Sequence, residues 1–276
     1  MKKRFFVGFF VLFLILLSGV GEAFVPQTPH LLNLVVKKIK QPVGIEVYQN
    51  KKVLNYKDTQ KGVQQLKERL IYRYPNRFRS EIISDAMKSF SVESDFECIK
   101  VMNGVIISND KPLLDMYTDI LLYRNHETLL KQLVLAGIDI DKVSFQRFND
   151  TVCYVIGRPL TKDSPFAGLW IEKESFLPVK YVVEKNGWIV EFFYINWQQV
   201  SKTWYPKQVY IFLDNQLFTT IEVNKIDLKS NFSLSLFDID HIKRLYPKNE
   251  PDSLDENSRQ VDDLDRRIEN FKKLYE

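Results

Sequence analysis

The sequence has few of the residues from which catalytic and metal sites are usually built. It contains two cysteines and three histidines among 276 residues. None of His30, His126 and His241 lies at metal-ligand spacing from another histidine, a cysteine or a carboxylate. The sequence has no glycine-rich phosphate loop, no G-x-S-x-G elbow and no local cysteine-histidine pairing. It therefore predicts no metal site, no cofactor and no catalytic residue, and favours a protein that is not an enzyme.

The sequence also lacks a strong net charge. Its formal net charge is +4 at pH 7. Removal of residues 1–23, which carry three positive charges and one negative charge, leaves about +2. No basic stripe stands out in the remainder, and nucleic acid is therefore not an expected partner.

The first 23 residues have the pattern of a secretory signal peptide. A basic cap at residues 2–4 precedes the apolar run Phe5–Leu17, and small residues follow at Gly21–Ala23. A transmembrane anchor is the alternative, although the apolar run is shorter than the roughly 20 residues that a bilayer requires. No cysteine lies at the cleavage region, so a lipid anchor is not indicated. We expect cleavage near Ala23 and a soluble protein in the periplasm.

The two cysteines lie in separate strand-like runs. Cys98 is part of "FECIKV" and Cys153 of "TVCYVIG". An exported protein is folded in a compartment that permits disulfides. A bridge between the two residues and a pair of buried free thiols are both compatible with the sequence, because the distance between the two Cα atoms is not known from it.

The order of predicted elements indicates an α+β fold. A helix is expected from Thr28–Pro29, and strands follow from Val43 to Ser108. Helical spacing returns between Pro112 and Gly137, and strands resume from Val143 to about Phe237. We expect a large antiparallel sheet with helices gathered on one face.

One hairpin indicates which sheet face is apolar. Asn186 and Gly187 suit a two-residue turn, which would place Val183 opposite Val190, Tyr181 opposite Phe192 and Val179 opposite Tyr194. The next strand extends the same surface. The predicted lining of a hydrophobic cavity is Val179, Tyr181, Val183, Val190, Phe192, Tyr194, Val209, Ile211 and Leu213. A fully packed core is the alternative to a cavity.

The chain resembles a known family in two stretches. "YRYPNRFRSEI" (Tyr72–Ile82) and the run from "GLWIEKESFLPVK" through "WYPKQVYIFLD" and "TTIEV" to "LFDI" (Gly168–Ile239) are similar to the outer-membrane lipoprotein-sorting proteins typified by LolA and its relative LolB. The resemblance implies an incomplete antiparallel β-barrel, that is a curved sheet, with helices covering the concave face as a lid over bound acyl chains. It also implies that an arginine near the Pro-x-x-Phe strand holds the lid, and Arg77 and Arg79 are the candidates.

The resemblance also sets the expected function. It implies a periplasmic carrier that binds acyl chains of lipoproteins or lipids and helps to move them to the outer membrane, with inner- and outer-membrane transfer proteins as partners. The alternative is a regulatory or interaction module of the same fold that senses a lipid or lipoprotein and reports to a protein partner. A third class is an envelope scaffold whose barrel interior is packed shut.

The end of the chain differs from the rest in its amino-acid composition. Residues 24–246 are expected to form the half-barrel domain, and residues 247–276 a polar linker followed by an amphipathic helix. Val261, Leu264, Ile268, Phe271 and Tyr275 share one heptad stripe. Docking of this helix on the domain, binding of a partner and an isolated solvated helix are the three interpretations.

Overall fold

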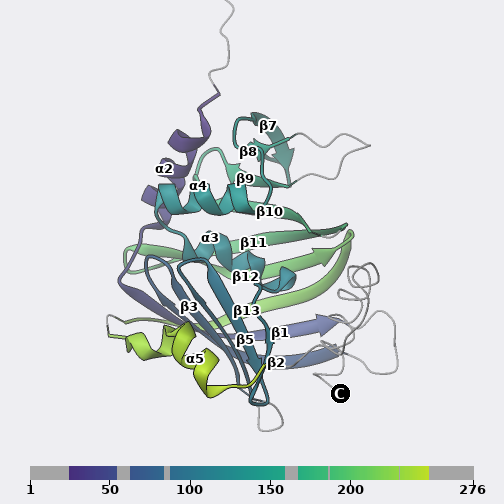
Figure 1. Ribbon diagram of the computed structural model, residues 1–276. Coiled ribbons are helices and arrows are strands. Elements are labelled where there is room, and N and C mark those ends of the chain that lie inside the picture. The colour runs from purple at the N-terminus through teal and green to yellow at the C-terminus, as the bar shows by residue number, and fades with distance from the viewer. Residues whose placement is uncertain are drawn as a thin grey trace, which may run out of the picture.

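The fold is built on one large antiparallel sheet. The computed structural model describes residues 25–54, 63–83, 88–158, 167–185, 187–229 and 231–248 (Figure 1). The strands are β1 (Gly44–Leu54), β2 (Val63–Arg73), β3 (Arg77–Ile83), β4 (Ser89–Ser94), β5 (Glu97–Met102), β6 (Val105–Ser108), β7 (Val143–Phe148), β8 (Thr151–Gly157), β9 (Gly168–Glu172), β10 (Pro178–Lys185), β11 (Trp188–Val200), β12 (Thr203–Leu213) and β13 (Gln216–Leu228). The helices are α2 (Thr28–Ile39), η1 (Leu113–Thr118), α3 (Asp119–Leu122), α4 (His126–Leu135), η2 (Leu234–Phe237) and α5 (Ile239–Leu245).

The two ends of the sheet are joined through helices and not through strands. The strand order is β6-β5-β4-β3-β2-β1-β13-β12-β11-β10-β9-β8-β7, with β1 paired to β13. Within the described chain β6 and β7 are therefore the two edge strands, and the curved sheet stays open (Figure 1). The connection between these edges carries η1, α3 and α4. The predicted α+β fold, an incomplete antiparallel barrel with helices on its concave face, is confirmed.

Different helices cover the two faces of the sheet. We call inner the face to which Ile45 and Val47 point, where α2, η1, α3 and α4 contribute to the same core. On the outer face Ile71 of β2 packs with Phe237 of η2 and Ile242 of α5. Neighbouring residues of a strand point to opposite faces, which is why Ile71 belongs to a different cluster from Leu70 and Tyr72. No expectation from the sequence covered this outer helix.

On the inner face, the first helix begins and the last helix ends where the sequence predicts. Helix α2 starts at Thr28 with Pro29 in its first turn, where a missing backbone N–H costs nothing. Its residues Leu31, Leu32, Val35 and Ile39 form one buried stripe. In α4, the Asn125 side chain accepts from the N–H groups of Glu127 and Thr128. Gly137 follows the helix with a positive φ of 81°.

The hairpin formed by β10 and β11 has the register expected from its Asn-Gly pair. Tyr181 pairs with Phe192 and Val183 with Val190, and Lys185 pairs with Trp188 across the two-residue connection. Asn186 lies outside the described residues, and Gly187 has a positive φ of 78°. The alternation of side chains along these strands therefore brings the predicted apolar residues to the inner face.

Val179 is the exception, and its predicted position is corrected. The pairing of β10 with β9 shifts register between Pro178 and Lys180. This irregularity changes the alternation, so that Val179 packs with the outer cluster that contains Cys153 and Trp170. The expected pair of Val179 with Tyr194 is not part of the ladder between β10 and β11. The register shift places Val179 on the outer face. The alternation of side chains along a strand does not predict such an irregularity.

Two valines of the first strand region test the position of the core. Val47 of β1 has no exposed surface, whereas Val43 just before this strand is 62% exposed. We expect Val47→Ala to lower the free energy of unfolding by about 2 kcal/mol, because a buried side chain is shortened in the ladder that joins β1 to β13. Val43→Ala should change it by less than about 0.5 kcal/mol. Urea denaturation measures both, and equal losses would contradict the assignment of the inner face.

Candidate functional site

Eight of the nine predicted cavity residues lie together on the inner face. Tyr181, Val183, Val190, Phe192, Tyr194, Val209 and Ile211 are buried in the inner core, and the partly buried Leu213 packs against it. These side chains are in contact with the helices that cross the concave side. The rings of Tyr117 and Phe192 lie 6.4 Å apart, and the hydroxyl of Tyr194 donates to the backbone oxygen of Tyr117 at 2.8 Å. The apolar inner face of β10 to β12 is thus covered in this structure.

The covering element is the connection between the two edge strands. We call Leu113–Leu135, which comprises η1, α3 and α4, the lid insert. Its buried apolar side chains are Met116, Tyr117, Ile120, Leu121, Leu122, Tyr123, Leu129 and Leu133. They occupy the space that the sequence assigns to a ligand, so the lid insert and a ligand on the same face would have to exchange places.

The lid insert is attached to the first half of the sheet by polar groups. Gln49 of β1 donates to the hydroxyl of Tyr117 at 2.9 Å and to Glu68 at 2.6 Å. The ammonium of Lys51 lies 3.1 Å from the carboxylate of Asp115. Gln49 and Lys51 follow Ile45 and Val47 in the same alternation, although β1 shifts register against β13 between Tyr48 and Gln49. The inner face of β1 therefore changes from apolar at Ile45 and Val47 to polar at Gln49 and Lys51.

A buried ionic cluster ties the same insert to β4. The ammonium of Lys111 lies 2.7 Å from Glu93 and 2.5 Å from Asp119, and Asp119 also accepts from Gln132 at 2.9 Å. Burial disfavours the charged form of Asp119 and raises the pKa of its carboxyl, although Lys111 opposes this shift. The two carboxylates outweigh the burial of Lys111 and raise the pKa of its ammonium. The hydroxyl of Tyr123 completes the cluster by donating to Glu93.

Arg124 belongs to the lid insert and attaches it to β12 and to the residue that follows α2. It donates to the backbone oxygen of Leu121 at 2.9 Å, to that of Lys40 after α2 at 3.1 Å, and to Thr203 Oγ1 at 2.5 Å. Its guanidinium also lies over the rings of Tyr74 and Tyr205, at 5.2 and 6.0 Å from their centroids. Buried arginines need several acceptors, and these acceptors come from the insert, from α2 and from β12.

The two arginines predicted for this contact lie elsewhere. Arg77 and Arg79 alternate with Phe78, which points into the inner core, and so both face outward. Arg79 donates to a helix carbonyl, but it is that of Leu236 in η2, at 3.2 Å. Of these three arginines, Arg124 is the one that donates to a carbonyl of the insert. The resemblance had suggested the kind of interaction, while the sequence had no signal that a buried arginine follows α3.

The two cysteines are free thiols. Cys98 lies on β5 and Cys153 on β8, and both strands are next to an edge strand at opposite ends of the strand order. Cys153 points to the outer cluster. Of the two alternatives that the sequence left open, the structure has the unbridged pair, and nine strands lie between β5 and β8 in the sheet.

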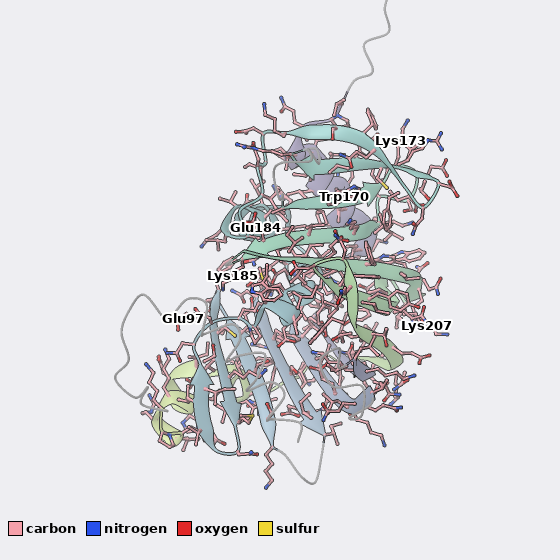
Figure 2. The ribbon with its side chains drawn as sticks, turned by 90° about the vertical axis from the view of Figure 1, so that its right-hand side faces the viewer. Glu97, Trp170, Lys173, Glu184, Lys185 and Lys207 are labelled. Carbon is pink, nitrogen blue, oxygen red and sulfur yellow. The ribbon has the colours of Figure 1, made fainter. Side chains whose placement is uncertain are left out.

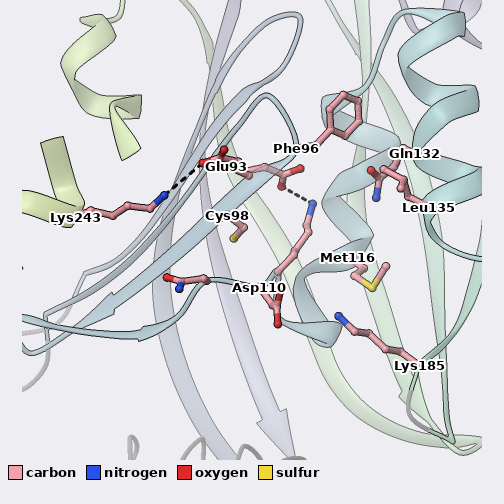
Figure 3. Close-up of a pocket in the computed structure, with 12 residues that line it drawn as sticks. Glu93, Phe96, Cys98, Asp110, Met116, Gln132, Leu135, Lys185 and Lys243 are labelled. Atoms are coloured by element: carbon pink, nitrogen blue, oxygen red, sulfur yellow. Dashed lines mark hydrogen bonds and ion pairs between the residues drawn. The ribbon is translucent and has the colours of Figure 1, made fainter. Parts of the chain in front are cut away.

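A pocket of about 450 Å³ lies where the lid insert meets the first half of the sheet. Its walls come from the turn between β4 and β5, from residues 109–111, from the lid insert, from the end of β10 and from α5. Glu97 and Lys185 belong to different halves of the sheet and both line it (Figure 2). Figure 3 shows Cys98 between Lys243 on one side and Met116 and Lys185 on the other. The predicted cavity residues are not in this lining.

Neither a metal site nor a membrane helix is found in the part of the chain that the structure describes. Its His, Cys, Asp and Glu residues form no group of three that could hold a metal ion. None of its helices is both long and apolar enough to cross a bilayer. The segments with the predicted signal peptide and the predicted tail helix lie outside the described residues.

Comparisons with known proteins give structural neighbours and no sequence relatives. No family model matches the chain, and no curated protein matches its sequence. Among solved structures, a domain assigned to outer membrane lipoprotein sorting from Vibrio parahaemolyticus aligns with a TM-score of 0.54 at 12% identity, over 78% of this chain and 98% of that one. The chain has the LolA-like fold.

Two further structures support this fold. A LolA superfamily protein from Nitrosomonas europaea aligns with a TM-score of 0.54 at 11% identity, over 79% of this chain and all of that chain. A DUF1329 family protein from Desulfovibrio piger aligns with a TM-score of 0.52 at 13% identity, over the same shares. At these identities the likeness concerns the LolA-like architecture, and the side chains of the lid insert have to be read from this chain itself.

The ionic cluster can be tested with two lysine substitutions. Lys111→Met leaves the carboxylates of Glu93 and Asp119 buried without their cation, and we expect it to lower the free energy of unfolding by about 3 to 5 kcal/mol. Lys243→Met removes a pair with Glu97 in which the two side chains are 44% and 68% exposed, and it should cost less than about 1 kcal/mol. Chemical denaturation compares the two, and similar small losses would contradict a buried cluster.

Proposed function

We propose that the protein is a periplasmic carrier that holds acyl chains of lipoproteins or lipids between the LolA-like sheet and its lid insert. One observation carries the proposal. The largely apolar inner face of β10 to β12 is closed by a separate segment, whose contacts along β1 include the hydrogen bond of Gln49 and the ion pair of Lys51. A segment attached in this way can leave one side of the sheet and expose an apolar surface for a ligand.

The energetics of opening differ between the two sides of the lid insert. Hydrogen bonds such as those of Gln49 with Tyr117 are replaced by bonds to water when the insert moves, and each contributes a net of only about 1 kcal/mol. Separation from Tyr181 and Phe192 exposes apolar surface, which is unfavourable unless something else covers it. An acyl chain supplies that cover. Burial of about fourteen methylene groups is worth roughly 11 kcal/mol.

The proposal extends to location and partners. The signal-like residues 1–23 support cleavage near Ala23 and a location in the periplasm. An acylated protein or lipid cannot cross this compartment unaided, since its chains partition into membranes. We propose that a transfer protein of the inner membrane loads the carrier and that one of the outer membrane unloads it. The printed description of the Vibrio parahaemolyticus neighbour, lipoprotein sorting, supports this assignment, and no catalytic step is needed.

The decisive experiment is to identify what the protein carries. The mature protein, residues 24–276, is to be exported, purified without detergent and extracted with organic solvent for mass spectrometry. We expect an acyl-bearing species in near-stoichiometric amount. If none is present, and a dansyl-labelled fatty acid does not bind to the delipidated protein, the proposal is wrong and a scaffold with a packed interior is favoured.

The role of the lid insert has its own test. The hydroxyls of Tyr74 and Tyr194 donate to the lid carbonyls of Leu121 and Tyr117, at 2.9 and 2.8 Å. Changing both tyrosines to phenylalanine removes about 2 kcal/mol from the closed state. We therefore expect uptake of the dansyl-labelled fatty acid to become about 30-fold faster in stopped-flow fluorescence.

A third tyrosine serves as the control for this test. Tyr210 of β12 is half-buried and pairs with Phe193 and Thr220 on the side of the strand that faces away from the lid insert. Tyr210→Phe should leave the uptake rate unchanged. Equal rates for the wild type, this control and the double variant would show that uptake does not depend on separation of the lid insert.

A further inference from the structure

The pocket shares a wall with the apolar inner face of the sheet. Met116 of η1 lines the pocket and is also part of the inner core. The next residue, Tyr117, covers Phe192 on β11, with the two ring centroids 6.4 Å apart. Consecutive Cα atoms lie only about 3.8 Å apart. A ligand chain on the inner face would therefore run only a short way to place its end in the pocket.

Strand β10 leads from the apolar inner face to the same pocket. Tyr181 and Val183 are buried in the inner core, and Lys185 at the end of the strand lines the pocket. Side chains two residues apart in a strand share a face and are separated by about 6.6 Å along it. The inner side of β10 thus carries an ammonium group directly after its last apolar residue. This order suits an amphiphile with an apolar chain and a polar end that bears negative charge.

Lys185 differs from the other lysines of the pocket in its surroundings. Lys111 is held in the ionic cluster with Glu93, and Lys243 lies 3.5 Å from Glu97. None of the hydrogen bonds and ion pairs among the described residues involves Lys185 (Figure 3). A phosphate placed beside this ammonium group would accept a charge-assisted hydrogen bond, which is stronger than a neutral one.

The rest of the lining limits the net charge of the polar end. The pocket has as many carboxylates as ammonium groups, and its volume of about 450 Å³ lies within the range of small-molecule sites. Its charged residues are Lys111, Lys185, Lys243, Glu93, Glu97 and Asp110. A head group that is negative overall would meet the carboxylates unfavourably. A head group with a phosphate and an amine can pair with both signs of charge.

We propose that this pocket binds the head group of a zwitterionic phospholipid, with the phosphate beside Lys185 and the amine toward the carboxylates of Glu97 and Asp110. The acyl chain then replaces the lid insert on β10 to β12. This inference rests on the carrier function proposed above and adds the chemical class of the ligand to it. Because the pocket is present while the insert is closed, the head group can bind before the insert leaves the sheet.

Three competitors with the same lauroyl chain separate the contribution of the head group from that of the chain. Lysophosphatidylethanolamine, lysophosphatidylglycerol and monolauroylglycerol are used to displace the dansyl-labelled fatty acid from the delipidated mature protein, and fluorescence gives their affinities. We expect the zwitterionic competitor to bind about tenfold more tightly than the uncharged one, with the anionic one between them. Lys185→Gln should remove this advantage and leave the affinity of monolauroylglycerol unchanged.

A lysine outside the pocket serves as the matched control. Lys207 of β12 is exposed and lies far along the sheet from Lys185 (Figure 2). Lys207→Gln should leave all three affinities unchanged. Glu97→Gln removes a carboxylate from the pocket, and it should reduce the preference for the zwitterionic over the anionic competitor about threefold.

The outcomes separate this inference from the carrier function. Equal affinities of the three competitors, or a preference for the anionic one, would overturn the zwitterionic head-group site and leave the carrier function in place. The same holds if Lys185→Gln and Lys207→Gln have equal effects. If the dansyl-labelled fatty acid itself does not bind, the carrier function is wrong and the head-group site with it.

Discussion

The pairing of β1 with β13 is the constraint on which the rest of the structure depends. It joins the strands before the lid insert to those after it in a single sheet. With these two strands in the middle of the order, β6 and β7 become the edges, and the chain between them must cross the open side. Crossing on the concave side buries apolar side chains on both partners, which is the stable solution for a curved sheet with one apolar face.

The two halves of the resulting inner face differ in polarity. On β10 to β12 it is largely apolar and meets the lid insert through rings and aliphatic groups, with polar contacts at Tyr181, Tyr194 and Thr203. On β1 to β4 it carries Gln49, Lys51 and Glu93, each of which contacts a polar group of the insert. The first kind of contact can be exchanged for an acyl chain and the second for water. The proposed carrier role depends on this difference between the two kinds of contact.

Local patterns predicted the elements and much of the pairing. The Asn-Gly pair and the alternation around it led to the register of β10 with β11, because a two-residue turn leaves no choice of pairing. The same alternation failed at Val179, where a shift in register against β9 reverses the face. The resemblance suggested an arginine that binds the lid. It pointed to Arg77 and Arg79, whereas the buried Arg124 is the arginine that donates to backbone oxygens of Leu121 and Lys40.

What the sequence by itself determined is local: the helix stripes, the strand alternation, the hairpin register and the apolar surface of β10 to β12, since each depends on residues close together in the chain. Only the tertiary structure decided how Lys111 meets Glu93 and Asp119, why Cys98 and Cys153 stay apart, and that Lys248 lies beside Ile106 of β6. These features depend on strand order. Strand order follows from contacts between distant segments, and no single stretch of sequence encodes it.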